Sequence, residues 1–336
     1  MTPQAQLPKV AVIGTGGTIS SISADPLDVL DYPDFSRKGT VEEIVARTPE
    51  IARFAQCLPV GFREVGSTAI GPADWLALVQ LIHETDAAHP DLAGYVILHG
   101  TATLEETAYF LSLALKTRRP VALVGAQRPA SAVSADGPMN LVAAIRTVID
   151  PAAREIGVVV VLNDEIQAAR EVTKISSYRL NTFRTPDYGV LGQVDGDRVA
   201  FYRRGLRPHT ADTVFDVSGL DALPRVDIAY AYAGADGVAV DAMVAAGARG
   251  MISAGLPPGI PPPLQRQALE RAARAGVVVV QTSRGGAGRI ARRRYLREQG
   301  MVAGDNLNAQ KARVLLMLAL TQTSDPEAVQ RLFDTY

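Results

Sequence analysis

Short apolar runs alternate with amphipathic segments along most of this chain, and this alternation is the first indication of its fold. Four runs have the continuous apolar character of strands that are buried on both faces, as strands of parallel sheets are. They are KVAVIG from Lys9, YVILHG from Tyr95, PVALVGA from Pro120 and GVVVVLND from Gly157. Because such strands alternate with helical patterns, we predict an α/β fold, with a mainly parallel sheet covered by helices on both faces.

The helical pattern between the second and third runs has recognisable ends. Apolar residues at Leu104, Ala108 and Leu111 recur at helical spacing. Thr103 followed by Glu106 predicts a capping box at the start of this helix. Pro138, in SADGPMNL, suits the first turn of another helix.

The pattern changes after about residue 188. YGVLGQVDGDRVAFYRR predicts a hairpin that turns near residues 195–197, and the segment after it has no clear period. Alternation then restarts with VDIAYAYAG, GMISAGL and GVVVVQTS as strands, and LNAQKARVLLMLALTQT is a strong closing helix. We therefore expect a larger domain over residues 1–203, a linker over 204–224 and a smaller α/β domain over 225–336.

Composition narrows the classes of protein. The length of 336 residues suggests about two domains, and the net charge of -1 gives no support for nucleic acid or an anionic membrane as partner. The single cysteine, Cys57, excludes an intrachain disulfide and a cysteine-rich metal site. The first residues lack the pattern of a signal peptide, and no apolar run is long enough to span a bilayer. These features predict a cytoplasmic protein.

The glycine-rich stretch VAVIGTGGTISS follows the first predicted strand. Gly14 and Gly16 fit the start of a dinucleotide-binding G-x-G-x-x-G motif, but Ile19 stands at its last glycine. A phosphate-binding loop would need Gly-Lys followed by Ser or Thr, which is absent. His83 and His89 do not have the spacing of a zinc-binding helix, so no metal is expected. The stretch is therefore more consistent with a tight turn than with a nucleotide site.

Two loops carry threonines at positions suited to chemistry. Thr15 follows the first strand and Thr101 follows the second, so both lie where open α/β sheets bind ligands. A threonine hydroxyl attacks a carbonyl when a base takes its proton, and Lys174 in REVTKIS is a candidate base. The alternative from spacing alone is that the threonines cap helices and the lysine is solvated.

A wider set of motifs resembles the bacterial-type L-asparaginases, a family of threonine amidohydrolases. These motifs run in order over nearly the whole chain: TGGTI, HGTATLEETAYFL, GAQRPASAVSADGPMNL, REVTK and LNAQKARVLLMLALTQT. The resemblance implies a larger N-terminal and a smaller C-terminal α/β domain in a homotetramer of intimate dimers. It also implies a small-molecule amide as substrate, no metal or organic cofactor, and an active site shared between neighbouring subunits.

The resemblance also implies roles for particular residues. Thr15 matches the family's nucleophile in TGGTI, so that the glycines admit the substrate and the threonine attacks it. Thr101 matches the second catalytic threonine, and Lys174 matches the lysine that pairs with it. Ser67 in EVGSTAI matches the residue that binds the substrate carboxylate, and Tyr32 is the counterpart of the catalytic tyrosine in the mobile loop.

Departures from the family pattern are concentrated around the substrate. Where the family reads H-G-T-D-T, this chain has Ala102 after Gly100 and Thr101, and beside Ser67 it has Thr68 where the family often has Gln. We assign Gly100, Ala102, Ser67 and Thr68 to substrate binding. The missing aspartate binds the α-ammonium of asparagine in the family. The nearby acidic residues suit the capping box and first turn of the following helix better than this role; they are Glu105 and Glu106.

Two departures lie in the predicted second domain. Pro258 and Ile260 stand near the place where the family usually has Asn, and the arginine run 292–294 lies where a further acidic residue normally occurs. The run also suits a solvated helix face.

Together these patterns predict an amidohydrolase that works through a threonyl acyl-enzyme. Because an ammonium without a carboxylate is costly to bury, the substrate is expected to lack a free α-ammonium or to carry that nitrogen acylated. Ordinary hydrolysis of asparagine or glutamine and a non-catalytic sensor of small acids remain alternatives. A nucleotide-binding dehydrogenase is a distant one.

Overall fold

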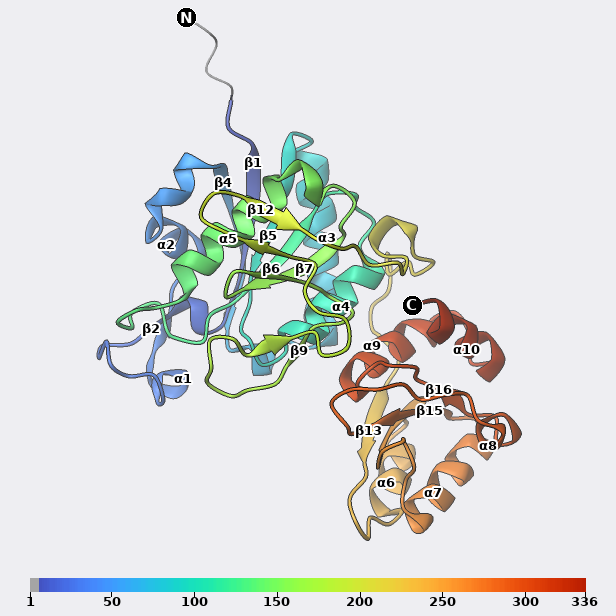
Figure 1. The fold of residues 1–336 in the computed structure, drawn as a ribbon. Helices are drawn as coiled ribbons and strands as arrows, with labels where there is room; N and C mark the ends of the chain where they lie inside the picture. The colour runs from blue at the N-terminus through green and yellow to red at the C-terminus, as the bar shows by residue number, and fades with distance from the viewer. Residues whose placement is uncertain (1–5) are drawn as a thin grey trace, which may run out of the picture. The chain divides into compact units, whose positions relative to one another are not determined.

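A computed structural model describes residues 6–336 of the chain, which divides between Asp212 and Thr213 into two compact units. The boundary lies within residues 204–224. In the first unit, eight strands form one sheet: β1 (Lys9–Gly16), β4 (Gln56–Val65), β5 (Leu92–Leu98), β6 (Val121–Val124), β7 (Val158–Leu162), β8 (Glu165–Ala168), β11 (Gly192–Val194) and β12 (Val199–Phe201). Their order is β12-β11-β8-β7-β6-β5-β1-β4 (Figure 1). The five strands from β7 to β4 run parallel, which confirms the predicted mainly parallel sheet.

Helices cover both faces of this sheet. α2 (Val41–Ala46) and α5 (Gly137–Ile149) pack on one face, and α3 (Pro72–Ala88) and α4 (Leu104–Ala114) lie together on the other (Figure 1). The central strands are buried on both faces because their side chains alternate between these two helical layers. Short elements surround the sheet: α1 (Tyr32–Phe35), the ribbon of β2 (Ser21–Ile22) with β3 (Arg37–Lys38), and the ribbon of β9 (Thr173–Lys174) with β10 (Phe183–Arg184).

The second unit is a smaller α/β structure, as the sequence predicts. Its four parallel strands follow the order β13 (Val226–Tyr230), β14 (Gly250–Gly255), β15 (Val278–Ser283) and β16 (Val302–Ala303). The helices are α6 (Val238–Ala245), α7 (Pro263–Arg274), α8 (Arg294–Glu298), α9 (Ala309–Ala319) and α10 (Pro326–Thr335). The sequence pattern did not predict α10, which follows the expected closing helix α9.

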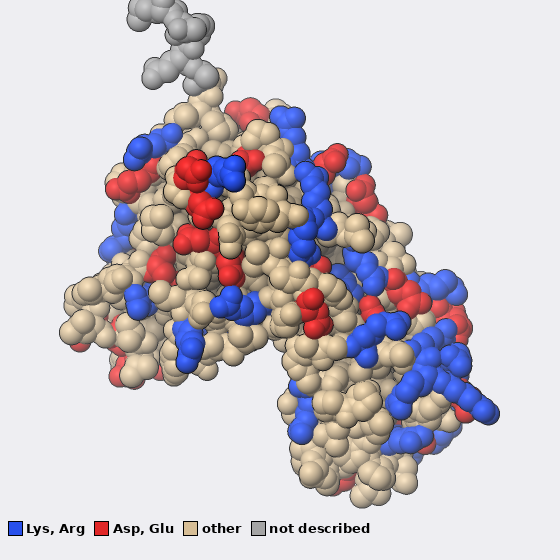
Figure 2. Space-filling view, viewed as in Figure 1, with Lys and Arg blue, Asp and Glu red and all other residues tan. Residues whose placement is uncertain are grey.

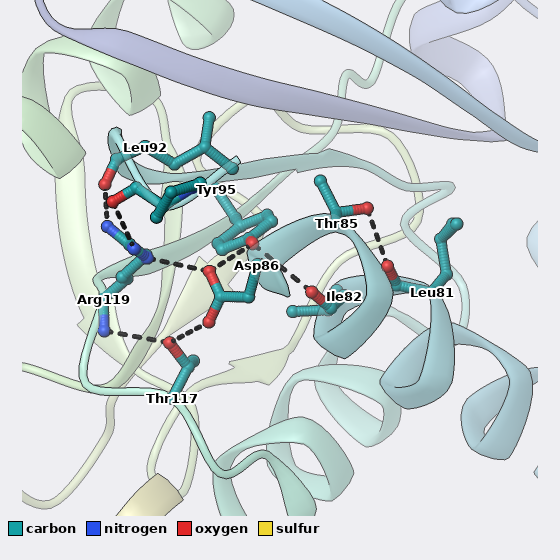
Figure 3. A network of polar contacts seen from close by, with 9 residues as sticks. Leu81, Ile82, Thr85, Asp86, Leu92, Tyr95, Thr117 and Arg119 are labelled. Carbon is teal, nitrogen blue, oxygen red and sulfur yellow. Dashed lines mark hydrogen bonds and ion pairs between the residues drawn. The ribbon is translucent and has the colours of Figure 1, made fainter. Parts of the chain in front are cut away.

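A polar network at the amino end of β5 joins this strand to the end of α3 (Figure 3). Asp86 Oδ1 accepts the Tyr95 hydroxyl at 2.5 Å and Arg119 Nε at 2.7 Å, and its Oδ2 accepts the Thr117 hydroxyl at 3.1 Å. Arg119 also donates to the carbonyl of Leu92. Burial, followed by contact with Asp86, raises the pKa of Tyr95, so this phenol stays protonated and donates. The network therefore ties three segments together on the side of the sheet opposite the carboxyl ends.

Replacing Asp86 with alanine is expected to lower the free energy of unfolding by about 2 kcal/mol, because Tyr95 and Arg119 lose their shared acceptor. Urea denaturation followed by circular dichroism measures this loss. The matched control is Asp91→Ala, because the Asp91 carboxylate is mostly exposed at 3.5 Å from Lys9 and should contribute less than about 0.5 kcal/mol. Equal losses for the two variants would contradict a stabilising role for the network.

Candidate active site

Two threonine-bearing loops leave the sheet at the carboxyl ends of β1 and β5. β1 lies between β4 and β5, and the chain runs from β1 to β4 on one side before it returns to β5 on the other. Such a reversal opens a crevice beyond the carboxyl ends of the strands, which is the usual ligand position in open α/β sheets. The loop after β1 carries Thr18, and the loop after β5 carries Thr101.

Glycines allow these two loops to touch. Gly17 has a φ angle of 84°, and a Cβ atom on it would lie 2.2 Å from the Cα atom of Gly100. A Cβ atom on Gly100 would lie 2.7 Å from Oγ of Ser67, in the turn after β4. Only glycine fits at these close approaches. The residues that follow β1, β4 and β5 are therefore brought to one place.

Thr15, the hydroxyl predicted to attack, is part of β1 and is 1% exposed. Its Oγ1 donates a hydrogen bond of 2.9 Å to the main-chain carbonyl of Leu98, at the end of β5. This bond joins two central strands and turns the hydroxyl away from solvent. The geometry therefore gives Thr15 a structural place and does not favour it as the attacking group.

Thr18, three positions further along, is the more accessible hydroxyl of the same stretch. It begins the 3-10 helix Thr18–Ser20 and is partly exposed. Its Oγ1 lies 3.0 Å from the hydroxyl of Tyr32, the first residue of α1. Tyr32, which the resemblance singled out, is thus in contact with Thr18. The TGGTI motif contains both threonines, and their different burial distinguishes them.

The segment that carries Tyr32 is fixed by Asp28. Asp28 Oδ1 accepts the main-chain N–H groups of Leu30, Asp31 and Tyr32 at 3.2, 2.8 and 3.1 Å. Its Oδ2 accepts the Ser23 hydroxyl at 3.0 Å. Burial opposes ionisation, but these hydrogen bonds outweigh it and hold the pKa of Asp28 below its ordinary value. An ionised Asp28 therefore holds the turn that precedes α1.

Thr101 and Lys174 form a second polar pair. The Lys174 Nζ donates to the Thr101 Oγ1 at 2.7 Å, across 73 positions of sequence. Thr101 is buried and Lys174 is partly buried. Burial lowers the pKa of Lys174, and the negative charge of Glu105 opposes this effect. A lysine with a lowered pKa beside a hydroxyl is suited to take a proton from it.

Glu105 has a role that the sequence did not indicate. The expected capping box is wrong, because Thr103 makes no side-chain capping bond and its hydroxyl donates instead to the carbonyl of Ser67 at 2.8 Å. Glu105 is 5% exposed, and its Oε1 accepts the Thr173 hydroxyl at 3.2 Å and the main-chain N–H of Lys174 at 3.1 Å. Glu105 therefore anchors β9, the strand that presents Lys174.

The predicted substrate-binding residues differ in their surroundings. Ser67 is buried, and its Oγ accepts the main-chain N–H of Ala102 at 3.1 Å. Ala102 is exposed at the mouth of the crevice, and Thr68 is exposed beside Ser67. The structure thus brings Ser67, Gly100 and Ala102 together around Thr101, and their part in substrate binding stays a prediction.

The arginine run of the second unit belongs to a basic area over α7 and α8, where blue side chains gather with red ones at their margin (Figure 2). Arg292 is paired with Glu327, Arg294 with Glu298 at 2.5 Å, and Arg293 donates to Gln281 Oε1 at 3.0 Å. These contacts all lie within the second unit. They agree with a solvated, ion-paired surface.

Within residues 6–336, no group of three or more His, Cys, Asp or Glu side chains is arranged to hold a metal ion. No helix of the described part of the chain is long and apolar enough to cross a membrane.

Comparison with known proteins gives consistent matches over the chain. Residues 9–207 match the family described as "Asparaginase, N-terminal", and residues 225–333 match "Glutaminase/Asparaginase C-terminal domain". The chain is 40% identical over 332 residues to "L-asparaginase 2" of Escherichia coli, covering 98% of this chain and 94% of the relative. It is 39% identical over 334 residues to "Probable L-asparaginase periplasmic" of Haemophilus influenzae, covering 99% and 94%. The crystal structure of a "Probable Cytoplasmic L-asparaginase" from Campylobacter jejuni superposes with a TM-score of 0.94 at 38% identity, covering 98% of this chain and 100% of that chain.

Proposed function

This chain belongs to the asparaginase family, whose members hydrolyse amide C–N bonds, and we propose that it cleaves a small carboxamide through an acyl-enzyme formed on Thr18. One observation carries the proposal: Thr18, which contacts Tyr32, and Thr101, which contacts Lys174, lie on two loops whose glycines touch. The burial of Thr15 leads us to assign the attack to Thr18.

The reaction needs no group beyond the substrate and water. Thr18 Oγ1 attacks the amide carbon, its proton passes to the Tyr32 oxygen, and Tyr32 gives its own proton to the leaving nitrogen. The C–N bond breaks, ammonia leaves, and an ester to Thr18 remains. Neutral Lys174 then takes the Thr101 proton while Thr101 takes one from water, and the resulting hydroxide hydrolyses the ester. The Thr18 oxygen leaves the ester and takes a proton from Tyr32, and the proton held by Lys174 returns through solvent to Tyr32, which restores all four side chains. The products are a carboxylic acid and ammonia.

The residue at position 102 is the basis for our proposal about the substrate. An α-ammonium bound beside Ala102 would meet a methyl group, and an ammonium deprived of water without a carboxylate costs several kcal/mol. We therefore propose a substrate without a free α-ammonium, its carboxylate held by Ser67. Ordinary L-asparaginase activity is the competing function, and one observation favours it: Glu105 is a negative charge close to Lys174 in the same region.

Ammonia release from asparagine, glutamine, succinamate and N-acetyl-asparagine tests this proposal. The unmodified protein is expected to hydrolyse succinamate or N-acetyl-asparagine with a higher kcat/KM than asparagine. Ala102→Asp is expected to raise the relative kcat/KM for asparagine about a hundredfold, because it restores a carboxylate. A wide preference of the unmodified protein for asparagine would establish the competing function. Tight binding of a small acid without ammonia from any amide would indicate a sensor.

Glu105 provides a prediction about Lys174. Glu105→Gln keeps an oxygen acceptor but removes the charge that raises the pKa of Lys174. Since the neutral lysine is the active form, the acid limb of the kcat profile is expected to move to lower pH. Glu105→Ala also loses the bonds to β9 and is expected to lower the plateau about tenfold. The surface variant Glu84→Gln is the control. Identical pH profiles of kcat for all three variants would refute the influence of Glu105 on Lys174.

The quaternary structure and the compartment are proposed on the resemblance. We propose a homotetramer in which neighbouring subunits share each active site, which light scattering of the purified protein tests. The relatives include one named periplasmic and one named cytoplasmic. We propose the cytoplasm as the location of this protein, and cell fractionation tests this proposal.

A further inference from the structure

A pocket of about 590 Å³ lies next to Ala102 in the first unit. Its walls are Ala102, Glu105, Lys174 and the segment 175–178 that follows β9. An ammonium group is similar in size to a water molecule, whose share of liquid volume is about 30 Å³. The pocket is wide open to solvent, and its volume lies within the range of small-molecule sites, about 300–1,000 Å³, and exceeds what an ammonium group requires.

Among the residues that line the pocket, the one carboxylate is already hydrogen-bonded to the β9 segment and is not set aside for an ammonium group. Ala102 offers no charge, and the Glu105 carboxylate already accepts the Thr173 hydroxyl and the Lys174 main-chain N–H. When Lys174 is protonated it repels an ammonium group in the same space. An uncharged substrate nitrogen needs no carboxylate partner and is not repelled by a protonated Lys174.

The segment 175–178 gives the pocket surfaces that suit an acyl group. Ile175 and Tyr178 are 60% and 72% exposed, so each offers apolar surface to a bound group. The Ser176 hydroxyl accepts the main-chain N–H of Arg179 at 3.4 Å and can still donate to an amide carbonyl, and the Ser177 hydroxyl can donate or accept in the same way. The lining therefore combines two apolar surfaces with hydroxyl groups, and an acylamido group offers a match to both kinds of surface.

The backbone that carries this wall is held in place before any substrate arrives. Ile175 N donates to the Thr182 carbonyl at 2.8 Å, and Ser176 N donates to the Thr182 hydroxyl at 3.2 Å. Thr182 also donates its hydroxyl to the carbonyl of Ser176. The wall is therefore anchored to the ribbon of β9 and β10, and a bound group would not have to order it.

From these observations we propose that the pocket beside Ala102 binds an acyl group on the α-nitrogen of the substrate. This inference rests on the proposed function and selects, between a missing and an acylated nitrogen, the acylated one. The substrate class is an asparagine-type amide with a free carboxylate and an acylamido group. Two sources have this chemistry: a simple N-acyl-asparagine and a peptide that ends in asparagine.

The test compares kcat/KM for succinamate, N-acetyl-asparagine and leucyl-asparagine. At least one acylated compound is expected to exceed succinamate about tenfold, because it fills the pocket. Preference for N-acetyl-asparagine alone identifies a small acyl group, and preference for leucyl-asparagine alone identifies a peptide end. Tyr178→Ala is expected to reduce the ratio of the preferred acylated compound to succinamate about tenfold. The control Tyr202→Ala, which changes an exposed tyrosine that does not line the pocket, should keep the original ratio.

The outcomes separate this inference from the function on which it rests. If succinamate is hydrolysed as well as the acylated compounds, or if Tyr178→Ala leaves the ratio unchanged, the acyl pocket is overturned and the proposed hydrolase stands. If no amide releases ammonia, the proposed function itself fails.

Discussion

Thr18→Val is expected to lower kcat by roughly 10⁴-fold or more, because the variant keeps the shape of the side chain but has no hydroxyl to form the ester. Thr18 is partly exposed beside the Tyr32 hydroxyl, so it is placed to attack and to pass on its proton. Steady-state ammonia release measures the loss. Mass spectrometry of the protein quenched during turnover should show the acyl adduct on the unmodified enzyme and not on the variant.

The matched control for this prediction is Thr15→Val, in the same TGGTI stretch. It removes the buried hydrogen bond to the Leu98 carbonyl and is expected to cost about 1 kcal/mol of stability. The active site keeps its Thr18 hydroxyl, so turnover should remain within a few-fold of the unmodified protein. The assignment of the nucleophile would be reversed if a folded Thr15→Val variant lost turnover while Thr18→Val retained it.

Lys174→Met is the second large prediction, with kcat expected to fall by about 10³-fold. Methionine preserves the length and apolar stem of the side chain but cannot take the Thr101 proton. Thr101→Val should cause a similar loss, and the double variant should be little worse than either one, because the two residues act as a unit. Fully additive losses would show that they act independently.

The pH dependence of Lys174 gives this prediction a specific signature. Burial lowers the pKa of Lys174, so the neutral base accumulates, and kcat rises, as the pH increases through that lowered value. Folding shows the same linkage: the unfolded chain binds the extra proton between the lowered native pKa and about 10.4, so the unfolding free energy increases with pH across that interval. Lys174→Met should abolish both increments, and an unchanged unfolding profile would contradict the burial of the charged group.

Some elements of the fold and of the site could be predicted from the sequence, and others could not. The four apolar runs gave four strands of the first sheet because strands buried between two helical layers need apolar side chains on both faces. The Thr101–Lys174 pair was predicted from two motifs in the resemblance, and the hydrogen bond between them is present. The role of Glu105 was not predicted, because its partners on β9 lie 68 and 69 positions away and no local pattern reports such contacts.

The sequence by itself determined the α/β class, the family and the motifs that supply hydroxyls and a lysine to the carboxyl edge of the sheet. Only the tertiary structure decided which hydroxyl of TGGTI is accessible and which carboxylate faces Lys174. The physical reason is that burial and charge depend on neighbours from distant segments. The pairing of β1 with β5 places Thr15 on the Leu98 carbonyl, and the β9–β10 ribbon brings Lys174 to Glu105.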